Sequence, residues 1–360
     1  MSGAYLILEN ETVFKGRFFG YEAEAVGELV FSTGMTCYLE TLTDPCHFGQ
    51  IVLQTFPLIG NFGVIPAEFS SGAGQLKAYI VREHCQEPSN FRSEGNLDTF
   101  LYQNKIPGLC GIDTRALTRV IRNNGTMNAM LSKTPELSGE QWTALRGYKI
   151  TGAVKAVSQN GPTAIFTDSP GTERKTQKLA LWDFGDTLRS LHMLASQGFQ
   201  FDNEFDYSAA ADEILAGNPD GVVLTDGPGD PAENTRIIKE IKKLCDAKIP
   251  IFAVGLGHQL LALAQGAKTE KLLFGHHGVN QPVRETETGR VFMTAQNHGY
   301  AVTPDSLPDT AEMSYINLND GTCEGVRYTD IPAFSVQFRP PYEARGLFDK
   351  FTDLMERGRN

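Results

Sequence analysis

The sequence predicts an α/β protein with two domains. An N-terminal, β-rich mixed α/β domain is expected over residues 1–150, and a C-terminal domain with a doubly wound, mostly parallel sheet over residues 179–360. Up to about residue 146, short β-rich runs alternate with turns, and a helical period appears only late. After residue 178, apolar strands, Gly-rich turns and helical segments alternate, which is typical of a parallel sheet covered by helices on both faces.

The N-terminal domain is expected to contain strands at residues 5–9 and 28–32, which are β-rich runs bounded by Gly or Asn. A helix is expected to begin at Asp113 or Thr114, because either side chain can cap free backbone N–H groups. Its apolar stripe consists of Leu117, Val120 and Ile121. Asn124-Gly125 supplies the signal that ends it.

Residues 151–178 differ from the segments on either side. They are polar, they carry Pro and Gly, and their apolar residues follow no helical or strand period. This composition predicts a linker between the two domains.

In the C-terminal domain, each expected strand runs into a Gly-rich turn. The strands are residues 179–182, 221–224 and 250–254, and the turns are residues 183–185, 226–231 and 255–259. Residues 260–264 continue the last turn as a helix. Because ligand sites of parallel sheets lie at the carboxyl ends of the strands, these turns are the expected site.

The composition narrows the classes of partner and compartment. There are 32 Lys and Arg against 43 Asp and Glu, for a net charge of -11, which argues against nucleic acid or an anionic membrane as a partner. The 6 cysteines are scattered with no CxxC pair, which indicates reduced thiols and no disulfide framework or zinc site. With no signal peptide pattern and no long apolar run, a cytoplasmic protein is expected.

Residues 253–259, Ala-Val-Gly-Leu-Gly-His-Gln, are the most informative stretch. A strand that turns sharply into a helix, with small residues on both sides of the apex, is typical of a nucleophile elbow. The helix N-terminus stabilises an anion at such a turn. The pattern alone is weak, because Gly-rich strand-to-helix turns occur in any parallel sheet.

The chain from about Tyr5 to Glu356 resembles the small, glutamine-hydrolysing subunit of carbamoyl-phosphate synthetase, a class I glutamine amidotransferase. The motifs run in the family's order. In the first domain they are Thr33–Thr36, Leu42–Pro45, Pro57–Asn61, Ser89–Arg92 and Gly111–Arg115. In the second domain they are Asp183–Gly185, Asp226–Pro231, Leu256–Ala264, Phe274–Gly278 and Gln296–Gly299. The resemblance implies that the second domain is a class I glutamine amidotransferase domain and that the first docks on a large subunit.

The positions that match the family's catalytic residues depart from its pattern. The family uses a Cys nucleophile, a His base and a Glu that orients the His, and the chemistry needs all three. Here the nucleophile position is Gly255 and the base position is Arg339, which stays protonated near neutral pH. The orienting position falls on Pro341, or on Glu343 if two residues are inserted. The resemblance therefore implies a catalytic set that is not intact, and we expect no glutamine hydrolysis.

The positions that match the family's glutamine contacts agree with its pattern better than the catalytic positions do. They are Gly227, Gly229, Leu256, Gln259, Asn297, Gly299 and Tyr300, with Cys46 in place of a first-domain Ser. Turn glycines also persist for the fold alone, so glutamine binding stays open. A further departure is the Asp186–Arg189 segment, where the family usually has a Lys-Arg-Asn run. His258, His276, His277 and His298 lack Asp or Glu partners at ligand spacing in the sequence, so no metal is expected.

Three functional hypotheses follow from the resemblance. In the first, the chain is a structural or regulatory subunit that docks on a carbamoyl-phosphate synthetase large subunit and supports ammonia-dependent synthesis for the pyrimidine and arginine pathways. ATP and bicarbonate would then bind the large subunit, and this chain would need no cofactor. In the alternative, it is a stand-alone regulatory protein that binds glutamine or a related amino acid. In the third, ranked last, Cys46 or Glu343 provides relocated chemistry.

Overall fold

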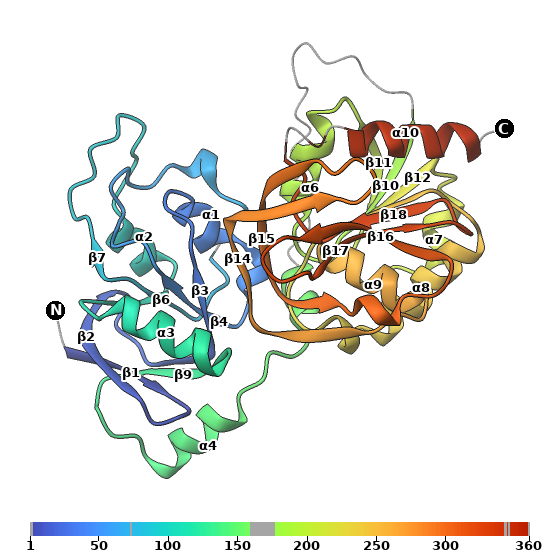
Figure 1. Cartoon of the computed structure of the whole chain (residues 1–360). Helices are drawn as coiled ribbons and strands as arrows, with labels where there is room; N and C mark the ends of the chain where they lie inside the picture. The colour runs from blue at the N-terminus through green and yellow to red at the C-terminus, as the bar shows by residue number, and fades with distance from the viewer. Residues whose placement is uncertain (1–2, 73, 159–176, 342–343, 345, 359–360) are drawn as a thin grey trace. The chain divides into compact units, whose positions relative to one another are not determined.

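The computed structural model describes residues 3–72, 74–158, 177–341, 344 and 346–358. The chain divides into two compact units (Figure 1). The N-terminal unit comprises Met1–Thr151 and Leu273–Gly278, and the C-terminal unit comprises Gly152–Leu272 and Val279–Asn360. Of the helices described, none combines the length and the apolar character needed to cross a bilayer.

The N-terminal unit is built on a closed barrel with the strand order β1-β2-β8-β6-β4-β3-β9. Its barrel strands are β1 (Gly3–Leu8), β2 (Val13–Gly20), β3 (Ala25–Ser32), β4 (Gln50–Gln54), β6 (Ala78–Ile80), β8 (Pro107–Cys110) and β9 (Met127–Ser132). Antiparallel pairing of β1 with both β2 and β9 closes the barrel. The strands expected at residues 5–9 and 28–32 are confirmed as β1 and β3.

Short helices and a two-stranded sheet complete the N-terminal unit. They are α1 (Tyr38–Thr43), α2 (Leu97–Gln103), α3 (Thr114–Asn124), α4 (Gly139–Gly147), β5 (Leu58–Ile59) and β7 (Glu83–His84). One hydrophobic cluster joins barrel residues to Leu117 and Ile121 of α3. A second cluster joins barrel residues to α1 and α2. Helices thus cover two sides of the barrel.

The helix α3 forms as the sequence predicts. The Asp113 side chain accepts a hydrogen bond from the Ala116 N–H at 2.9 Å, which caps the first turn. The helix ends at Gly125, whose φ of 89° is unfavourable for residues with a Cβ atom. The apolar side chains Leu117 and Ile121 are fully buried.

Close packing of β8 against β2 depends on a small residue at position 108. Gly108 of β8 pairs with Phe19 of β2. A Cβ atom at Gly108 would lie 2.5 Å from two ring carbons of Phe19 and 2.8 Å from its carbonyl oxygen. No ordinary side chain fits there without a shift of β2.

The C-terminal unit is built on one large sheet with the order β11-β10-β12-β13-β18-β17-β15-β14-β16. Its strands are β10 (Lys178–Trp182), β11 (Gln200–Phe205), β12 (Gly221–Leu224), β13 (Ile251–Val254), β14 (Thr269–Glu285), β15 (Val291–Val302), β16 (Ala311–Asn317), β17 (Cys323–Tyr328) and β18 (Ala333–Val336). Strands β11, β10, β12, β13 and β18 are parallel. The parallel, doubly wound part of the sheet and the three strands that the sequence predicts are confirmed, and β14, β15, β16 and β17 extend the sheet through antiparallel pairs.

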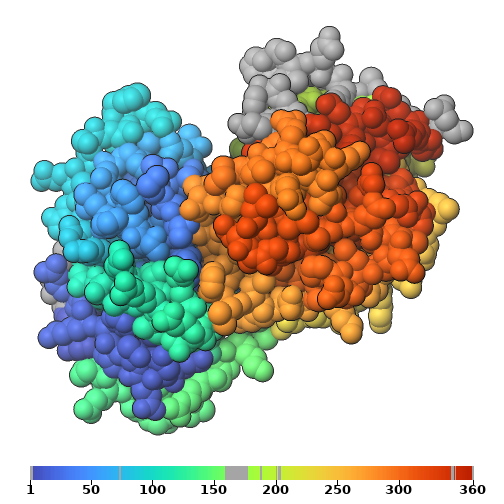
Figure 2. All heavy atoms as spheres, viewed as in Figure 1, coloured from blue at the N-terminus to red at the C-terminus, as the bar shows by residue number. Residues whose placement is uncertain are grey.

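Helices cover both faces of the parallel strands. They are α5 (Ala153–Ser158), α6 (Thr187–Ala195), α7 (Ala211–Ala216), α8 (Thr235–Asp246), α9 (Leu256–Ala264) and α10 (Gly346–Gly358). One hydrophobic cluster joins β-strand residues to α7, α8 and α9, and the other joins the opposite face to α6 and α10. The red segment in Figure 2 is α10, whose polar side faces solvent. Alternate residues of each strand therefore face different helices, as in a doubly wound sheet.

The segment expected to be a linker is described only at its ends. Residues 159–176 lie outside the described part. Before them, Ala153–Ser158 form the helix α5, which the sequence pattern did not indicate, and the assignment of residues 151–178 as a linker stays a prediction. The helix forms because Val154 and Val157 are buried.

Candidate functional site

A glycine stands at the apex of the elbow between β13 and α9. Gly255 has φ 55° and ψ -115°, a conformation that is strained for residues with a side chain. Its N–H donates to the Val336 carbonyl of β18 at 2.9 Å. Two residues on, a Cβ atom at Gly257 would lie 2.6 Å from the Leu224 carbonyl oxygen, so α9 approaches β12 closely because this residue is glycine. The structure thus has the backbone of a nucleophile elbow without a nucleophile.

The carboxylate of Asp226 fills the place of the side chain that Gly255 lacks. A Cβ atom at position 255 would overlap Asp226 Oδ1 and Cγ and lie 2.7 Å from Oδ2. Asp226 Oδ1 accepts hydrogen bonds from the Leu256 N–H at 2.9 Å and from the Gly227 N–H at 2.8 Å. Leu256 follows the apex, and its N–H is the donor that an elbow normally offers to an oxyanion. Sequence reasoning missed this role, because Asp226 reads as an ordinary turn residue.

Arg339, at the expected base position, lies beside a second buried carboxylate. Its Nε is 3.9 Å from Asp186 Oδ2, and Arg189 Nη1 is 3.6 Å from the same oxygen. Asp186 is 2% exposed, and its N–H donates to the Asp226 carbonyl at 3.1 Å. The loops after β10, β12 and β18 therefore meet at one edge of the sheet. A guanidinium beside a carboxylate holds charge there but cannot accept a proton from a nucleophile.

The amide of Gln259, an expected glutamine contact, is bonded within the protein. Gln259 Nε2 donates to the Tyr300 carbonyl at 2.7 Å and to Gln337 Oε1 at 2.8 Å. The same Tyr300 carbonyl also contacts His298 Nδ1 at 2.8 Å. Gln259 thus ties α9 to β15 and to the end of β18. This geometry supports a structural role for its amide nitrogen.

The other expected glutamine contacts of the C-terminal unit fall on two segments. Gly227 and Gly229 follow β12, and Asn297, Gly299 and Tyr300 lie on β15. A Cβ atom at Gly227 would overlap the Phe184 carbonyl oxygen, so packing alone requires this glycine. Gly299 differs, because among the described residues no atom lies within 4 Å of the place that a Cβ atom would take there.

The remaining expected site residues lie apart from this set in the chain. Cys46 belongs to the N-terminal unit, where it is buried and its N–H donates to Asp44 Oδ1 at 3.0 Å. Pro341 follows β18 closely, and its carbonyl accepts from the Ala344 N–H at 2.9 Å. Glu343 lies outside the described residues. Its proposed orienting role stays a prediction.

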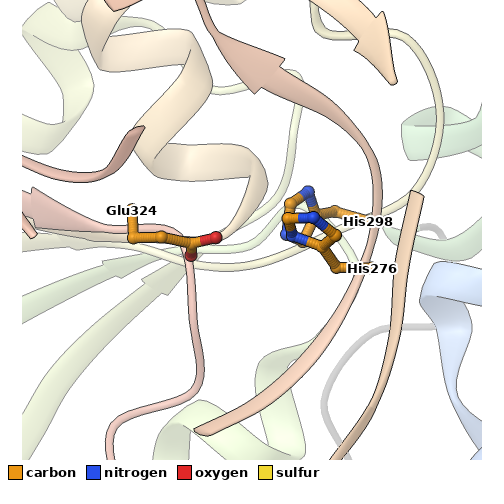
Figure 3. Close-up of side chains that lie close together, drawn as sticks. All are labelled: His276, His298 and Glu324. Carbon is orange, nitrogen blue, oxygen red and sulfur yellow. The ribbon is translucent and has the colours of Figure 1, made fainter. Parts of the chain in front are cut away.

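Figure 3 draws three side chains with metal-binding chemistry, His276, His298 and Glu324, all of them buried. His298 and Glu324 both belong to the C-terminal unit, and their ligand atoms lie within 4.8 Å of one another. The spacing along the sequence did not reveal this carboxylate, because β-strand pairing, not sequence proximity, brings Glu324 near His298. The expectation of no metal stays a prediction.

Within the C-terminal unit, Gln296 bridges these two side chains. Its Nε2 donates to Glu324 Oε2 at 2.9 Å, and its Oε1 lies 3.1 Å from His298 Nε2. Glu324 Oε1 also accepts from Asn317 Nδ2 at 3.1 Å. Hydrogen bonds within the unit thus stabilise this buried carboxylate.

His258 has a structural environment. It is fully buried on α9, and its Nδ1 lies 2.8 Å from Ser335 Oγ of β18. Burial lowers the pKa of His258 to about 3, because the apolar surroundings disfavour the charged imidazolium. The side chain is therefore neutral near pH 7 and ties the elbow helix to the sheet.

Comparisons with known proteins agree with the two-part organisation. Residues 6–131 match the family model "Carbamoyl-phosphate synthase small chain, CPSase domain", and residues 180–346 match "Glutamine amidotransferase class-I". A carbamoyl phosphate synthase small chain from Clostridium perfringens is 44% identical over 97% of this chain and 98% of its own. One from Lactococcus lactis is 43% identical over 99% of both chains. One from Syntrophotalea carbinolica is 44% identical over 99% of this chain and 98% of its own.

Proposed function

This chain belongs to the carbamoyl phosphate synthase small-chain family, and from that premise we propose that it is a structural or regulatory subunit that does not hydrolyse glutamine. It docks on a large subunit, which binds ATP and bicarbonate. The pair makes carbamoyl phosphate from free ammonia, for pyrimidine and arginine synthesis. The chain itself needs no cofactor and works in the cytoplasm.

The observation that carries this proposal is the elbow without a nucleophile. Gly255 has the strained backbone of a nucleophile position and no side chain to attack an amide. Arg339 stands where a base would be needed, and it lies beside Asp186. Attack on an amide needs a nucleophile and a group that accepts its proton, and both positions lack that chemistry.

The N-terminal unit supports a continuing role in an assembly. Its match to the small-chain family spans residues 6–131, which include the whole barrel apart from the ends of β1 and β9. Its core is well formed, with the barrel strands and α3 sharing one hydrophobic cluster. A docking unit of this kind is expected to keep its function after the other unit has lost catalysis.

The test is ammonia release from glutamine by the purified chain, alone and then with a large subunit, ATP and bicarbonate. We expect no release in either mixture. We also expect the complex to form carbamoyl phosphate when ammonium replaces glutamine. A small chain with an intact Cys, His and Glu set, mixed with the same large subunit, is the positive control.

Two results would overturn the proposal. Glutamine-dependent ammonia release by the unaltered chain would show that the catalytic chemistry persists elsewhere. If Cys46→Ala abolished that release, the nucleophile would be Cys46. Failure of the chain to associate with a large subunit from its own host would refute the docking role.

The alternative is a stand-alone protein that binds glutamine or a related amino acid. Gly299 favours a ligand site, because packing among the described residues does not require a glycine there, and Arg339 can pair with a carboxylate. The internally bonded Gln259 amide and the position of Asp226 oppose it. Calorimetry with glutamine and glutamate decides the matter, since absence of binding to either removes this alternative.

A further inference from the structure

The Asp226 carboxylate makes contacts that a reaction intermediate or a bound anion would otherwise make. In an elbow, the N–H after the apex and a second backbone N–H from a neighbouring loop bind the oxyanion of a tetrahedral intermediate. Here the corresponding groups are the Leu256 and Gly227 N–H groups. Both donate to the same oxygen, Asp226 Oδ1, at 2.9 and 2.8 Å.

The volume at the apex is also taken. The Asp226 carboxyl group overlaps the position of a Cβ atom at Gly255. Asp226 is 6% exposed, so its carboxylate is enclosed by the loops around it. It lies at the N-terminus of α9 (Leu256–Ala264), where the helix dipole favours a negative charge. The same contacts that would stabilise a ligand anion hold this carboxylate in place.

We propose that Asp226 is a built-in occupant of the anion site at the elbow, so that small carboxylates and oxyanions are excluded from the Leu256 and Gly227 N–H groups. This inference rests on the proposed loss of glutamine hydrolysis and gives a second physical reason for that loss. Replacing Gly255 by Cys does not recreate a reactive thiolate while Asp226 stays. Glutamine hydrolysis is thus prevented in two ways: position 255 has no side chain, and the Asp226 carboxylate occupies the anion site.

The first experiment measures the reactivity of a cysteine placed at the apex. The full chain carrying Gly255→Cys is compared with Asp226→Ala/Gly255→Cys by alkylation with iodoacetamide near neutral pH. Mass spectrometry of peptides separates the introduced thiol from the native cysteines, of which Cys37 and Cys85 are half-buried and serve as internal references.

The double variant is expected to react at least ~10-fold faster at position 255. Without Asp226, the two N–H groups and the α9 N-terminus stabilise the thiolate, and each unit of lowered thiol pKa raises the thiolate fraction about tenfold. The matched control is Asp230→Ala/Gly255→Cys. Asp230 is a carboxylate of the same turn whose Oδ1 accepts from the Ala232 N–H. This control is expected to react like Gly255→Cys alone.

The second experiment uses thermal unfolding, which does not depend on cysteine chemistry. Gly255→Ala, Asp226→Ala and the double variant form a thermodynamic cycle. The backbone strain of a Cβ atom at position 255 is the same with and without the Asp226→Ala substitution, so it cancels in the cycle. The overlap of that Cβ atom with the carboxylate occurs only when Asp226 is present, so it does not cancel. The loss of Tm in the double variant is expected to be smaller than the sum of the single losses.

The inference is refuted if the introduced thiol at position 255 reacts equally fast with and without Asp226, or if the unfolding cycle is additive. Neither measurement involves glutamine turnover. Ammonia release by the unaltered chain would refute the proposed function and leave these results interpretable. The two proposals can therefore fail separately.

Discussion

Replacing Gln259 by Leu tests whether this expected ligand contact is a structural tie. Gln259 is 3% exposed, and Leu is apolar with a broadly similar volume, so the change removes two hydrogen bonds and little packing. The bonds run from Gln259 Nε2 to the Tyr300 carbonyl and to Gln337 Oε1. The two acceptors differ in the hydrogen-bond partners that remain to them after the substitution.

The expected cost follows from the partners left behind. The Tyr300 carbonyl keeps its contact with His298 Nδ1, so loss of that bond costs about 0.5–1.5 kcal/mol. Gln337 is also 3% exposed, and its Oε1 loses the donor that Gln259 provides. A buried acceptor that loses its donor costs about 1–3 kcal/mol. We therefore expect Gln259→Leu to lower the free energy of unfolding by about 1.5–4.5 kcal/mol.

The assay is urea unfolding followed by tryptophan fluorescence. The chain has 2 tryptophans, and Trp142→Phe leaves Trp182 as a reporter of the C-terminal unit. Trp182 is fully buried on β10, so its emission changes when this unit unfolds. Gln337→Leu and the double variant complete a cycle in which the orphaned acceptor is removed.

The double variant is expected to lose less stability than the two single variants combined, by about 0.5–3 kcal/mol. An unchanged urea midpoint in Gln259→Leu would refute the structural role. If glutamine binding measured by calorimetry were lost at the same time, Gln259 would be a ligand contact instead.

Three further predictions concern the two cores and pH. Burial lowers the pKa of His258 to about 3, against about 6.5 in an unfolded chain. His258 therefore costs no stability above about pH 6.5. As the pH drops from there toward 3, only the unfolded chain takes up the proton, so the folded state is increasingly destabilised. The slope is at most about 1.4 kcal/mol per pH unit, and His258→Gln should flatten it in urea titrations across this range, while an unchanged slope would contradict the assignment. Phe252→Ala should cost about 3–5 kcal/mol by Trp182 fluorescence, since Phe252 is fully buried against Phe334, Phe348 and Phe351; a loss below about 1 kcal/mol would contradict this packing. Gly108→Ala should cost about 1–3 kcal/mol by Trp142 fluorescence, whereas Gly139→Ala, with open space around it, should cost little; equal effects would speak against the tight β2–β8 contact.

Local patterns predicted much of the fold. The strands at residues 179–182 and 221–224 were recognisable because fully buried parallel strands are continuously apolar. The helix α3 was recognisable because Asp113 caps it and Gly125 ends it. The barrel closure was not predicted, because pairing of β1 with β9 joins segments far apart in sequence, and no local pattern encodes that pairing.

The candidate site was predictable in position and less so in contents. The Gly-rich turns marked the carboxyl edge of the sheet, and the elbow at Gly255 is where the pattern indicated. The placement of Asp226 depends on a side-chain conformation that becomes available only when Gly255 has no Cβ atom. The position of Glu324 near His298 depends on pairing among β15, β16 and β17. Neither can be seen in one stretch of sequence.

The discontinuous N-terminal unit has a consequence for synthesis on the ribosome. Within this unit, the Thr126 N–H donates to the Leu273 carbonyl at 2.6 Å, and the Thr33 N–H donates to the His277 carbonyl at 3.1 Å. Residues 152–272 are translated between the first segment and the second. At about 5–20 residues per second, that takes roughly 6–24 s. All strands of the closed barrel therefore emerge before residue 273, whereas these two hydrogen bonds form only after residues 273–278 have been made. A chain arrested before residue 273 would fold its barrel without them.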